Sequence, residues 1–355
     1  MSGYGIILKK EFMQRSGGEI MKRFKVLWII LGVVVLLVGG GVGAAYYVVN
    51  STLSKMDMTE KIDKTEAGIE KDLLEKEKRS QVINIAVFGI DKNGDETDGR
   101  SDAMKILSLD TKNNEAKITS LQRDTLIYIP GVKQDFEKLN HAYAYGGAKL
   151  ALQTINYNFD LDLTRYVAFN FEAVEHVIDA MGGIELEIHE NEVPFIAEVS
   201  HSGYQHLDGK QALGYMRLRY SDNDYVRMDR QTAVMKAMFS KLSTLDYSQL
   251  LDLVNECLPY IETNISTNEI LSLGMKALKV DLGNIQSYQI PRGSGETVNQ
   301  SVTYNGYSPL YIVDSYQQLV KDVHEDIYGD SNYEPSKRVK EMEATIYEKF
   351  GYIEK

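Results

Sequence analysis

Two aspartates that flank one loop are the first candidates for chemistry. Asp91 ends a short apolar run, and Asp102 follows eleven residues later, beside Arg100, after a stretch rich in Gly, Asp and Asn. Two carboxylates that approach each other repel unless a cation or proton lies between them. Oxygen ligands of this kind, completed by phosphate oxygens, suit Mg2+. The pair therefore predicts a magnesium site, and the alternative is two unrelated loop aspartates.

Arginines form the other candidate clusters. Arg123 and Asp124 directly follow a predicted strand, where the simplest alternative is a local ion pair. Four arginines and a glutamine lie within residues 217–231 of an otherwise acidic chain: Arg217, Arg219, Arg227, Arg230 and Gln231. The first two share a face if their segment is extended, and the last three share one if theirs is helical. Guanidinium groups match phosphate oxygens and stay charged, so the cluster predicts an anion clamp; the alternative is a solvated basic patch.

Together, these clusters favour phosphoryl chemistry on a multiply charged group such as a pyrophosphate, because that chemistry relies on positioning and charge neutralisation. The sequence contains no P-loop, kinase motif or GxSxG elbow, which argues against ATP as the substrate. The single cysteine, Cys257, excludes an internal disulfide and a cysteine-based zinc site. A formal net charge of −12 argues against DNA binding.

The amino-terminal segment predicts a membrane anchor. Residues 26–49 form 24 consecutive uncharged positions, and about 20 apolar residues cross a bilayer as a helix. A cleaved signal peptide is the alternative, but the apolar run is long and lacks a clear cleavage site. Residues 1–25 carry a net charge of +4 (six Lys and Arg, two Glu) and stay in the cytoplasm. The rest of the chain is therefore expected outside the cell. Translation could start at Met1 or at Met21, which begins a typical anchor.

A charged stalk and one compact domain are expected after the anchor. Residues 50–80 predict a solvated helical spacer, which at 31 residues would reach roughly 45 Å. From residue 81, apolar strand patterns alternate with helical ones, which predicts a layered α/β/α domain with a central mixed sheet over 81–328. Residues 329–355 predict a polar carboxyl-terminal tail, frayed or helical.

The expected elements follow from periodicity and from turn and cap residues. Strands are expected at residues 82–90, 105–110, 116–122, 165–170, 184–188 and 287–290. Helices are expected at residues 140–156, 171–181, 208–216 (capped by Asp208), 228–242, 248–258, 268–279 and 308–323.

At its candidate site residues the sequence resembles the LytR-CpsA-Psr (LCP) family. The resemblance covers residues 81–328, and a single-pass anchor before that domain is also typical of the family. Its motifs occur in the family's order: NIAVFGID, GRSDAMKILSLD, ITSLQRDTLIYIP, KLNHAYAYGG, DAMGGIEL, HLDGKQALGYMRLRY, RMDRQ and IPRGSGETVNQSVTYNGYSPLYIVD. Each motif is weak alone, but the ordered set is specific.

The resemblance implies a function. LCP proteins are membrane-anchored phosphotransferases, mainly of Gram-positive bacteria. They move an anionic glycopolymer, such as teichoic acid or capsular polysaccharide, from an undecaprenyl pyrophosphate carrier to peptidoglycan. The new bond is a phosphodiester, usually to the C6 hydroxyl of N-acetylmuramic acid. The expected partners are therefore the lipid-linked polymer, peptidoglycan and the membrane, and no nucleic acid.

The resemblance also assigns roles to individual residues. Asp91 and Asp102 match the Mg2+-associated aspartates (Mn2+ is the other candidate ion), and one of them, together with Arg123, is expected to be catalytic. The pyrophosphate-binding residues are expected to be Arg100, Arg123, Arg217, Arg219, Arg227 and Gln231, and the motifs are flanked by two further candidates, Arg230 and Lys138. Gln122 stands where the family usually has proline.

Two other functions use the same residues. With water as the acceptor, the protein would be a pyrophosphatase acting on polyprenyl-linked substrates. With no turnover, it would be a wall-polymer receptor or regulator. Product analysis with and without peptidoglycan separates these alternatives from transfer.

Overall fold

The computed structural model describes residues 57–69, 81–91, 99–133, 135–218, 224–242, 258–277, 281–292, 300–304 and 307–350, and the single positions 249 and 253. The predicted cytoplasmic tail (1–25) and transmembrane helix (26–49) lie outside these residues. In the described part of the chain, no helix is both long and apolar enough to cross a membrane.

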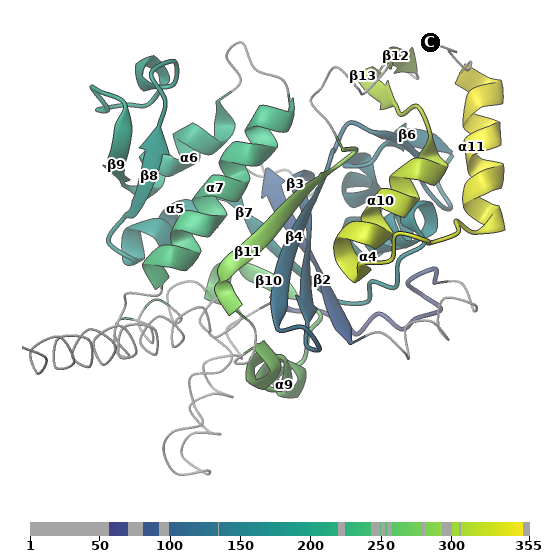
Figure 1. Ribbon diagram of the computed structural model, residues 1–355, viewed down its shortest axis with the longest axis horizontal. Helices are drawn as coiled ribbons and strands as arrows, with labels where there is room; N and C mark the ends of the chain where they lie inside the picture. The colour runs from purple at the N-terminus through teal and green to yellow at the C-terminus, as the bar shows by residue number, and fades with distance from the viewer. Residues whose placement is uncertain are drawn as a thin grey trace, which may run out of the picture.

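A seven-stranded mixed sheet forms the centre of the molecule (Figure 1), with strand order β1-β10-β7-β2-β3-β4-β11. Its strands are β1 Asp57–Met58, β2 Val82–Asp91, β3 Arg100–Asp110, β4 Glu115–Leu121, β7 Tyr166–Asn170, β10 Ile261–Thr263 and β11 Asp281–Ile290. The pairs β1–β10, β2–β7 and β4–β11 are parallel. The pairs β2–β3, β3–β4 and β7–β10 are antiparallel. The predicted α/β fold with a central mixed sheet is confirmed.

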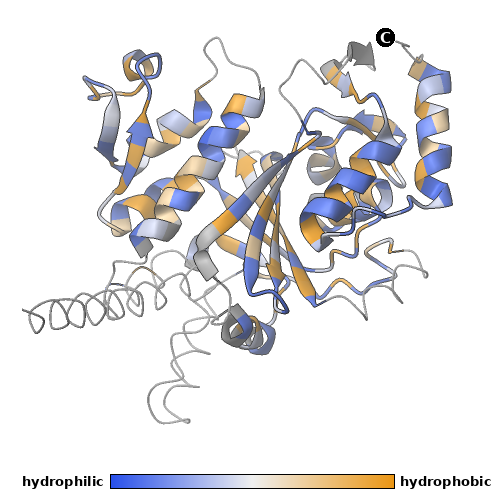
Figure 2. Cartoon of the chain, in the orientation of Figure 1, coloured by the Kyte–Doolittle hydropathy of each residue, from blue (hydrophilic) through white to orange (hydrophobic). Residues whose placement is uncertain are grey.

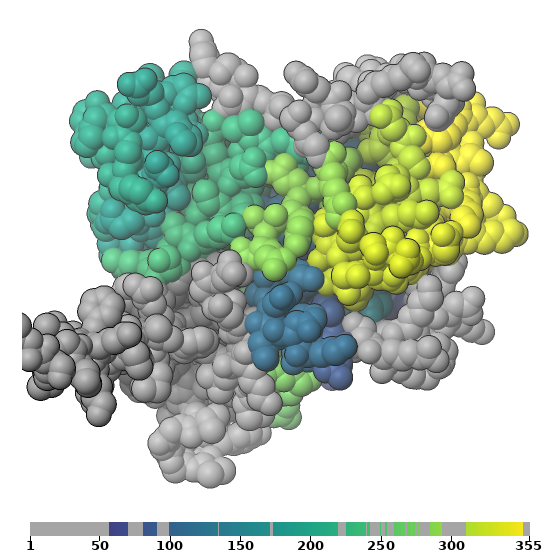
Figure 3. Space-filling model, viewed as in Figure 1, coloured from purple at the N-terminus to yellow at the C-terminus, as the bar shows by residue number. Residues whose placement is uncertain are grey.

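Helices cover both faces of this sheet (Figure 1). One face carries α5 Phe171–Ala180, α6 Gly209–Arg217 and α7 Asp224–Leu242, and the other carries α4 His141–Phe159, α10 Tyr316–Tyr328 and α11 Lys337–Phe350. The other helices in the described residues are α9 Thr267–Ala277 and the short helices Val193–Phe195 and Leu258–Tyr260. The other described strands form three two-stranded sheets: β5 Leu126–Tyr128 with β6 Phe136–Lys138, β8 Ile184–Ile188 with β9 Gly203–Leu207, and β12 Gln300–Tyr304 with β13 Tyr307–Ile312. In the space-filling view, α5–α7 and α10–α11 lie on opposite sides of β11 (Figure 3).

Strand alternation divides the core into two halves. Leu107 and Leu109 of β3 pack with the α5–α7 helices, whereas Met104 and Ile106 of the same strand pack with α4 and α10. Because successive side chains of a strand point to opposite faces, one strand serves both layers. Hydrophobic residues accordingly run along the central strands in Figure 2, whereas α11 is largely hydrophilic on its visible face.

Local sequence signals position several elements as expected. Asp208 accepts a hydrogen bond from the Gln211 backbone N–H (2.8 Å), and the Gln211 side chain accepts one from the Asp208 N–H (3.0 Å). This reciprocal capping box satisfies two backbone donors at the start of α6 and confirms the predicted cap. Asn170 caps α5 with its side-chain oxygen, which accepts from Ala173 N at 2.7 Å.

The helix predicted at 308–323 is wrong in its first part. Residues 307–312 form β13, which pairs with β12, and α10 begins only at Tyr316. Ser315 has extended backbone angles, and its hydroxyl accepts from Gln318 N at 3.1 Å, so it caps the helix and fixes its start. Of the helix predicted at 248–258, only positions 249, 253 and 258 are described.

The helical stalk predicted for residues 50–80 is wrong over residues 57–69. Residues 57–58 form β1 on the edge of the sheet, and residues 64–68 form a turn. Asp63 and Glu66 exchange side-chain bonds with each other's backbone N–H groups (3.2 and 2.7 Å). Ala67 and Ile69 are buried against the α4–α10–α11 half of the core. Ile62 and Ile69 therefore pack against the domain.

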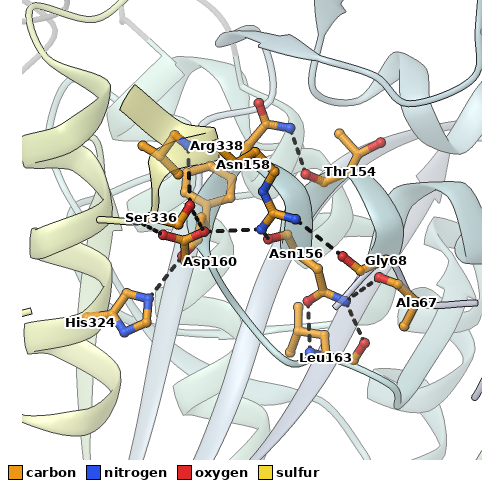
Figure 4. Close-up of polar contacts among 12 residues, drawn as sticks. Ala67, Gly68, Thr154, Asn156, Asn158, Asp160, Leu163, His324, Ser336 and Arg338 are labelled. Atoms are coloured by element: carbon orange, nitrogen blue, oxygen red, sulfur yellow. Dashed lines mark hydrogen bonds and ion pairs between the residues drawn. The ribbon is translucent and has the colours of Figure 1, made fainter. Parts of the chain in front are cut away.

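A buried polar network joins this amino-terminal segment to the carboxyl terminus (Figure 4). The Asn156 amide of α4 donates to Ala67 O and Leu163 O, both at 2.8 Å. Arg338 of α11 donates to the Asp160 carboxylate at 3.1 Å and to Asn156 O at 3.1 Å. The predicted carboxyl-terminal tail is thus helical over residues 337–350, and α11 packs on the domain.

We expect Ile69→Ala to lower the free energy of unfolding by about 2–4 kcal/mol, because it removes a buried side chain and leaves a cavity. Met58→Ala, at a position that is 38% exposed, is the matched control and should change stability by less than ~0.5 kcal/mol. Urea unfolding of the two variants measures the difference. Equal stabilities would show that this segment does not belong to the folded core.

Candidate active site

The ends of several strands meet at one edge of the sheet. Asp91, the last residue of β2, pairs with Arg100, the first residue of β3. Leu121 at the end of β4 pairs with Ile290 at the end of β11. Since β2, β4 and β11 run in the same direction, their carboxyl ends lie together, which is where ligands commonly bind in open α/β sheets.

A bulge at this edge reorients Asp102. Gly89 pairs with Ala103 and Ile90 pairs with Ser101, so Asp102 is the extra residue on β3. Bulges redirect side chains and interrupt strand pairing. The Asp102 carboxylate forms an ion pair with the Arg123 guanidinium, and both side chains are about 85% buried (14% and 15% exposed). The structure therefore brings together two residues that the sequence predicts as site members.

Asp124 and Lys138 extend this ion pair into a chain of alternating charge. Arg123 Nε lies 3.4 Å from one Asp124 oxygen, and Lys138 Nζ lies 2.8 Å from the other. Lys138, predicted only as a flanking candidate, is thus part of the cluster. Partly buried charges act through a lower effective dielectric than surface charges. We name Asp102, Arg123, Asp124 and Lys138 the edge cluster.

Backbone contacts hold the Arg123 loop in place. Gln122 N donates to Ile290 O (2.8 Å), and the Gln122 side-chain oxygen accepts from Asp124 N. Asn140 N donates to Arg123 O (3.1 Å), which ties this loop to the segment that carries Lys138. Proline at position 122 would lack the N–H that binds Ile290. Here glutamine makes that bond and also closes the turn with its side chain.

Glu137 and His141 lie buried beside the edge cluster and were not among the predicted site residues. Burial raises the pKa of Glu137, against the opposing effects of Lys138 and Arg100. Burial, with the nearby charges of Arg100 and Lys138, lowers the pKa of His141 to about 4. His141 is therefore neutral near pH 7, and the positive charge here comes from arginine and lysine. The motif KLNHAYAYGG contains Lys138 and His141, but periodicity gives neither residue a role.

The start of α7 lies at the same edge. Gln289, near the end of β11, donates to Tyr225 O (3.2 Å) and to the Asp229 carboxylate. Tyr311 N donates to Asp124 O (2.9 Å), and Tyr311 also packs against Tyr225. The first turn of α7 is thereby joined to the Arg123 loop. Its predicted clamp residues, Arg227 and Gln231, are buried (5% and 3% exposed) and one turn apart.

The other predicted residues lie in different settings. Arg230 forms a buried ion pair with Glu192 (2.8 Å) and donates to Leu218 O (3.2 Å). Arg217 is the exposed last residue of α6, so the extended segment considered for 217–219 is wrong at this position. Arg219 lies outside the described residues. The side chain of Asp91 is also outside them, and Arg100 is exposed.

The donor chemistry at the edge suits a small divalent cation. Asp91 and Asp102 come from the adjoining ends of β2 and β3, and the bulge frees Asp102 from strand pairing. Mg2+ is commonly held by one or two carboxylates, with water and substrate phosphates completing its octahedron. Among the described residues, no group of three or more potential protein ligands occurs. Two carboxylates at adjoining strand ends fit that ligand chemistry.

The geometry defines a class: a mixed-sheet α/β domain with a cluster of alternating charges at the edge where its strands end. The model of the LytR_cpsA_psr family matches residues 45–320. The chain belongs to this family.

Three relatives illustrate the similarity. The polyisoprenyl-teichoic acid–peptidoglycan teichoic acid transferase TagU of Bacillus mycoides is 32% identical over 302 residues, covering 83% of this chain and 94% of the relative. TagU of Enterococcus faecalis is 32% identical over 275 residues, covering 71% and 82%. The solved structure of TagT bound to LIIa-WTA matches with a TM-score of 0.56 at 25% identity, covering 71% of this chain and 92% of that one.

Proposed function

We propose that the protein transfers an anionic glycopolymer, a teichoic acid or a capsular polysaccharide, from an undecaprenyl pyrophosphate carrier to peptidoglycan. The product is a phosphodiester to N-acetylmuramic acid. The observation that carries this proposal is the edge cluster, which gathers Arg123 and Lys138 with two aspartates. The TagU relatives, named as teichoic acid transferases, support it. A lipid carrier also agrees with an anchor at residues 26–49 and an extracellular domain.

The cationic residues bind the pyrophosphate. Arg123 and Lys138 are fixed by ion pairs and backbone bonds, so they need no reorganisation when the anion arrives. Arg100 extends the positive charge on the exposed side of the edge, and we assign Arg227 and Gln231 of α7 to the same binding role on their sequence motif. We assign Arg217 and Arg219 to the same role on their sequence motif.

Asp91 and Asp102 would hold the Mg2+, or Mn2+, that the family resemblance implies. When bound, the ion would neutralise charge on the phosphate oxygens. The reacting step uses the chain's own groups. The acceptor hydroxyl oxygen bonds to the phosphorus nearest the sugar, and that phosphorus releases its bond to the bridging oxygen. The hydroxyl proton passes to the carboxylate of Asp91 or Asp102. Undecaprenyl phosphate leaves with the bridging oxygen and its electron pair.

The test is an incubation of the full chain, purified in detergent, with a synthetic lipid-linked donor, Mg2+ and peptidoglycan fragments. We expect a phosphodiester-linked product and release of one polyprenyl phosphate for each bond formed. Chelation with EDTA should reduce the rate at least tenfold, and added Mg2+ should restore it.

The same assay distinguishes the other functions. Release of polymer phosphate at the same rate without peptidoglycan would identify a pyrophosphatase. Saturable binding of the donor without any product would identify a receptor. Either outcome contradicts transfer.

A further inference from the structure

A lysine lies inside the protein between the sheet and α7. Lys105 of β3 is 3% exposed and points to the α7 side of the sheet. Its ammonium donates to Ser120 Oγ of β4 (2.7 Å) and to Thr232 Oγ1 of α7 (3.0 Å). The Thr232 hydroxyl in turn donates to Met228 O at 2.8 Å. The ammonium is thus the centre of a buried polar bridge between two strands and one helix.

A buried lysine here needs an explanation because an apolar side chain would fit this layer without the cost of burying a charge. Lys105 lies on the same face of β3 as Leu107 and Leu109, which belong to the hydrophobic core. Among the described residues, no carboxylate forms an ion pair with Lys105 within 4 Å. Asp229 of α7 is the acidic group that acts on it electrostatically. Asp229 is held by Gln289 of β11.

The bridge is close to the site along each of the three elements that it joins. Lys105 is three residues from Asp102, and its strand partner Ser120 is three residues from Arg123. Three residues of a strand span about 10 Å. Thr232 directly follows Gln231 and is five residues after Arg227, about 7.5 Å along the helix axis. A shift of α7 at Thr232 would therefore move the clamp residues with it.

We propose that Lys105 is a positioning residue: its ammonium fixes α7 on the sheet, holds Arg227 and Gln231 over the edge cluster, and adds a positive charge beneath the bound pyrophosphate. This inference rests on the proposed function and deepens it, because it makes donor affinity depend on the protonation of one buried group.

The electrostatics agree with such control near neutral pH. Burial lowers the pKa of Lys105 to about 7, and Asp229 opposes this. Burial raises the pKa of Asp229, which also faces Lys236. The facing strand residues, Ser120 and Val87, do not titrate in this range. An anion favours the charged lysine, so donor binding should be tighter below pH 7 and weaken as pH rises. A pyrophosphate diester carries constant charge over this range.

The test compares donor binding by wild-type and Lys105→Met full-length chains in detergent between pH 6 and pH 8.5. The probe is a synthetic polyprenyl-pyrophosphoryl disaccharide, which is such a diester. At pH 6 we expect Lys105→Met to bind about tenfold more weakly, as for a unit charge ~10 Å away at an effective dielectric of ~20. The difference in donor affinity between the two chains should narrow at pH 8.5.

Lys117→Met is the matched control. Lys117 is also a buried lysine, on β4, but it contacts Ile327 O of α10 on the opposite face of the sheet. This variant should retain the wild-type affinity and pH profile. Thr232→Val keeps Lys105 and removes one acceptor of its ammonium, so the midpoint of the pH profile of donor binding should shift to lower pH. This variant tests the bridge if Lys105→Met fails to fold.

The outcomes separate the two proposals. A wild-type affinity and pH profile in Lys105→Met, or in Thr232→Val if the first variant is unfolded, overturns the inference and leaves the proposed function intact. Failure of the wild-type chain to bind the probe at any pH overturns the proposed function and, with it, this inference.

Discussion

Replacing Arg123 with alanine is expected to lower kcat for glycopolymer transfer by about 10²–10³-fold, the usual effect of removing one preorganised donor to a developing anion. The guanidinium lies between Asp102 and Asp124 and is 14% exposed. Without it, two carboxylates face the phosphate with less neutralisation, so binding and turnover should both weaken. Initial rates with the lipid-linked donor and peptidoglycan fragments measure the loss.

Two further variants make this prediction specific. Arg123→Lys keeps a positive charge but lacks the planar fork, so its rate should fall between those of wild type and Arg123→Ala. Arg165→Ala removes another arginine that pairs with a carboxylate, Glu269 at 2.6 Å. Arg165 immediately precedes β7, at the end of that strand remote from the edge cluster, and its loss should change the rate less than twofold. Wild-type turnover by Arg123→Ala would show that Arg123 is not part of the active site.

Replacing Asp160 with alanine is expected to lower the free energy of unfolding by about 3–5 kcal/mol, because it leaves a largely buried arginine without its carboxylate. Asp160 has a fully buried side chain and accepts from Ser336 N (2.7 Å), Ser336 Oγ (2.8 Å) and Arg338 (3.1 Å). It also adopts a left-handed conformation (φ 51°) at the end of α4, which alanine tolerates poorly. Urea unfolding followed by circular dichroism measures the change.

Asp160→Asn is the matched variant for this network. Asparagine tolerates the left-handed conformation and retains an oxygen acceptor, so the loss should be smaller, about 1–3 kcal/mol. Glu341→Ala removes the exposed i,i+4 pair with Lys337 on the same helix as Arg338 and should cost less than ~1 kcal/mol. If Asp160→Ala were no less stable than Glu341→Ala, the network would not stabilise the fold.

Strands and helices could be predicted from the sequence where the local pattern is compatible with only one type of element. The apolar run at 82–90 is too short for a helix and forms β2, and Asp208 with Gln211 marks the start of α6. The segment 308–323 was ambiguous, because Leu310 and Ile312 suit a strand or a helix. The Ser315 cap separates β13 from α10. Residue propensities alone do not show whether the residues before such a cap form a strand or a helix.

The part of the site that depends on strand pairing could be predicted from the sequence. Asp102 and Arg123 lie opposite each other when the β3–β4 ladder is extended from Lys105 and Ser120. The pairing of Arg230 with Glu192 could not be predicted, since β9 and α6 lie between them in the chain. The position of Lys105 could be predicted from the sequence. It alternates in phase with Leu107 and Leu109, which places it on the face of β3 that points into the core.

The docking of residues 57–69 limits the reach of the domain from the membrane. With the anchor proposed at residues 26–49, only seven residues, 50–56, separate it from β1. Fully extended, seven residues span at most about 25 Å, well short of the roughly 45 Å that an unbroken helical spacer would provide. With that anchor, this short connection would keep the domain close to the bilayer, where, under the proposed function, a polyprenyl chain would remain in the lipid while its headgroup is bound. The acceptor glycan strand would then react near the membrane surface.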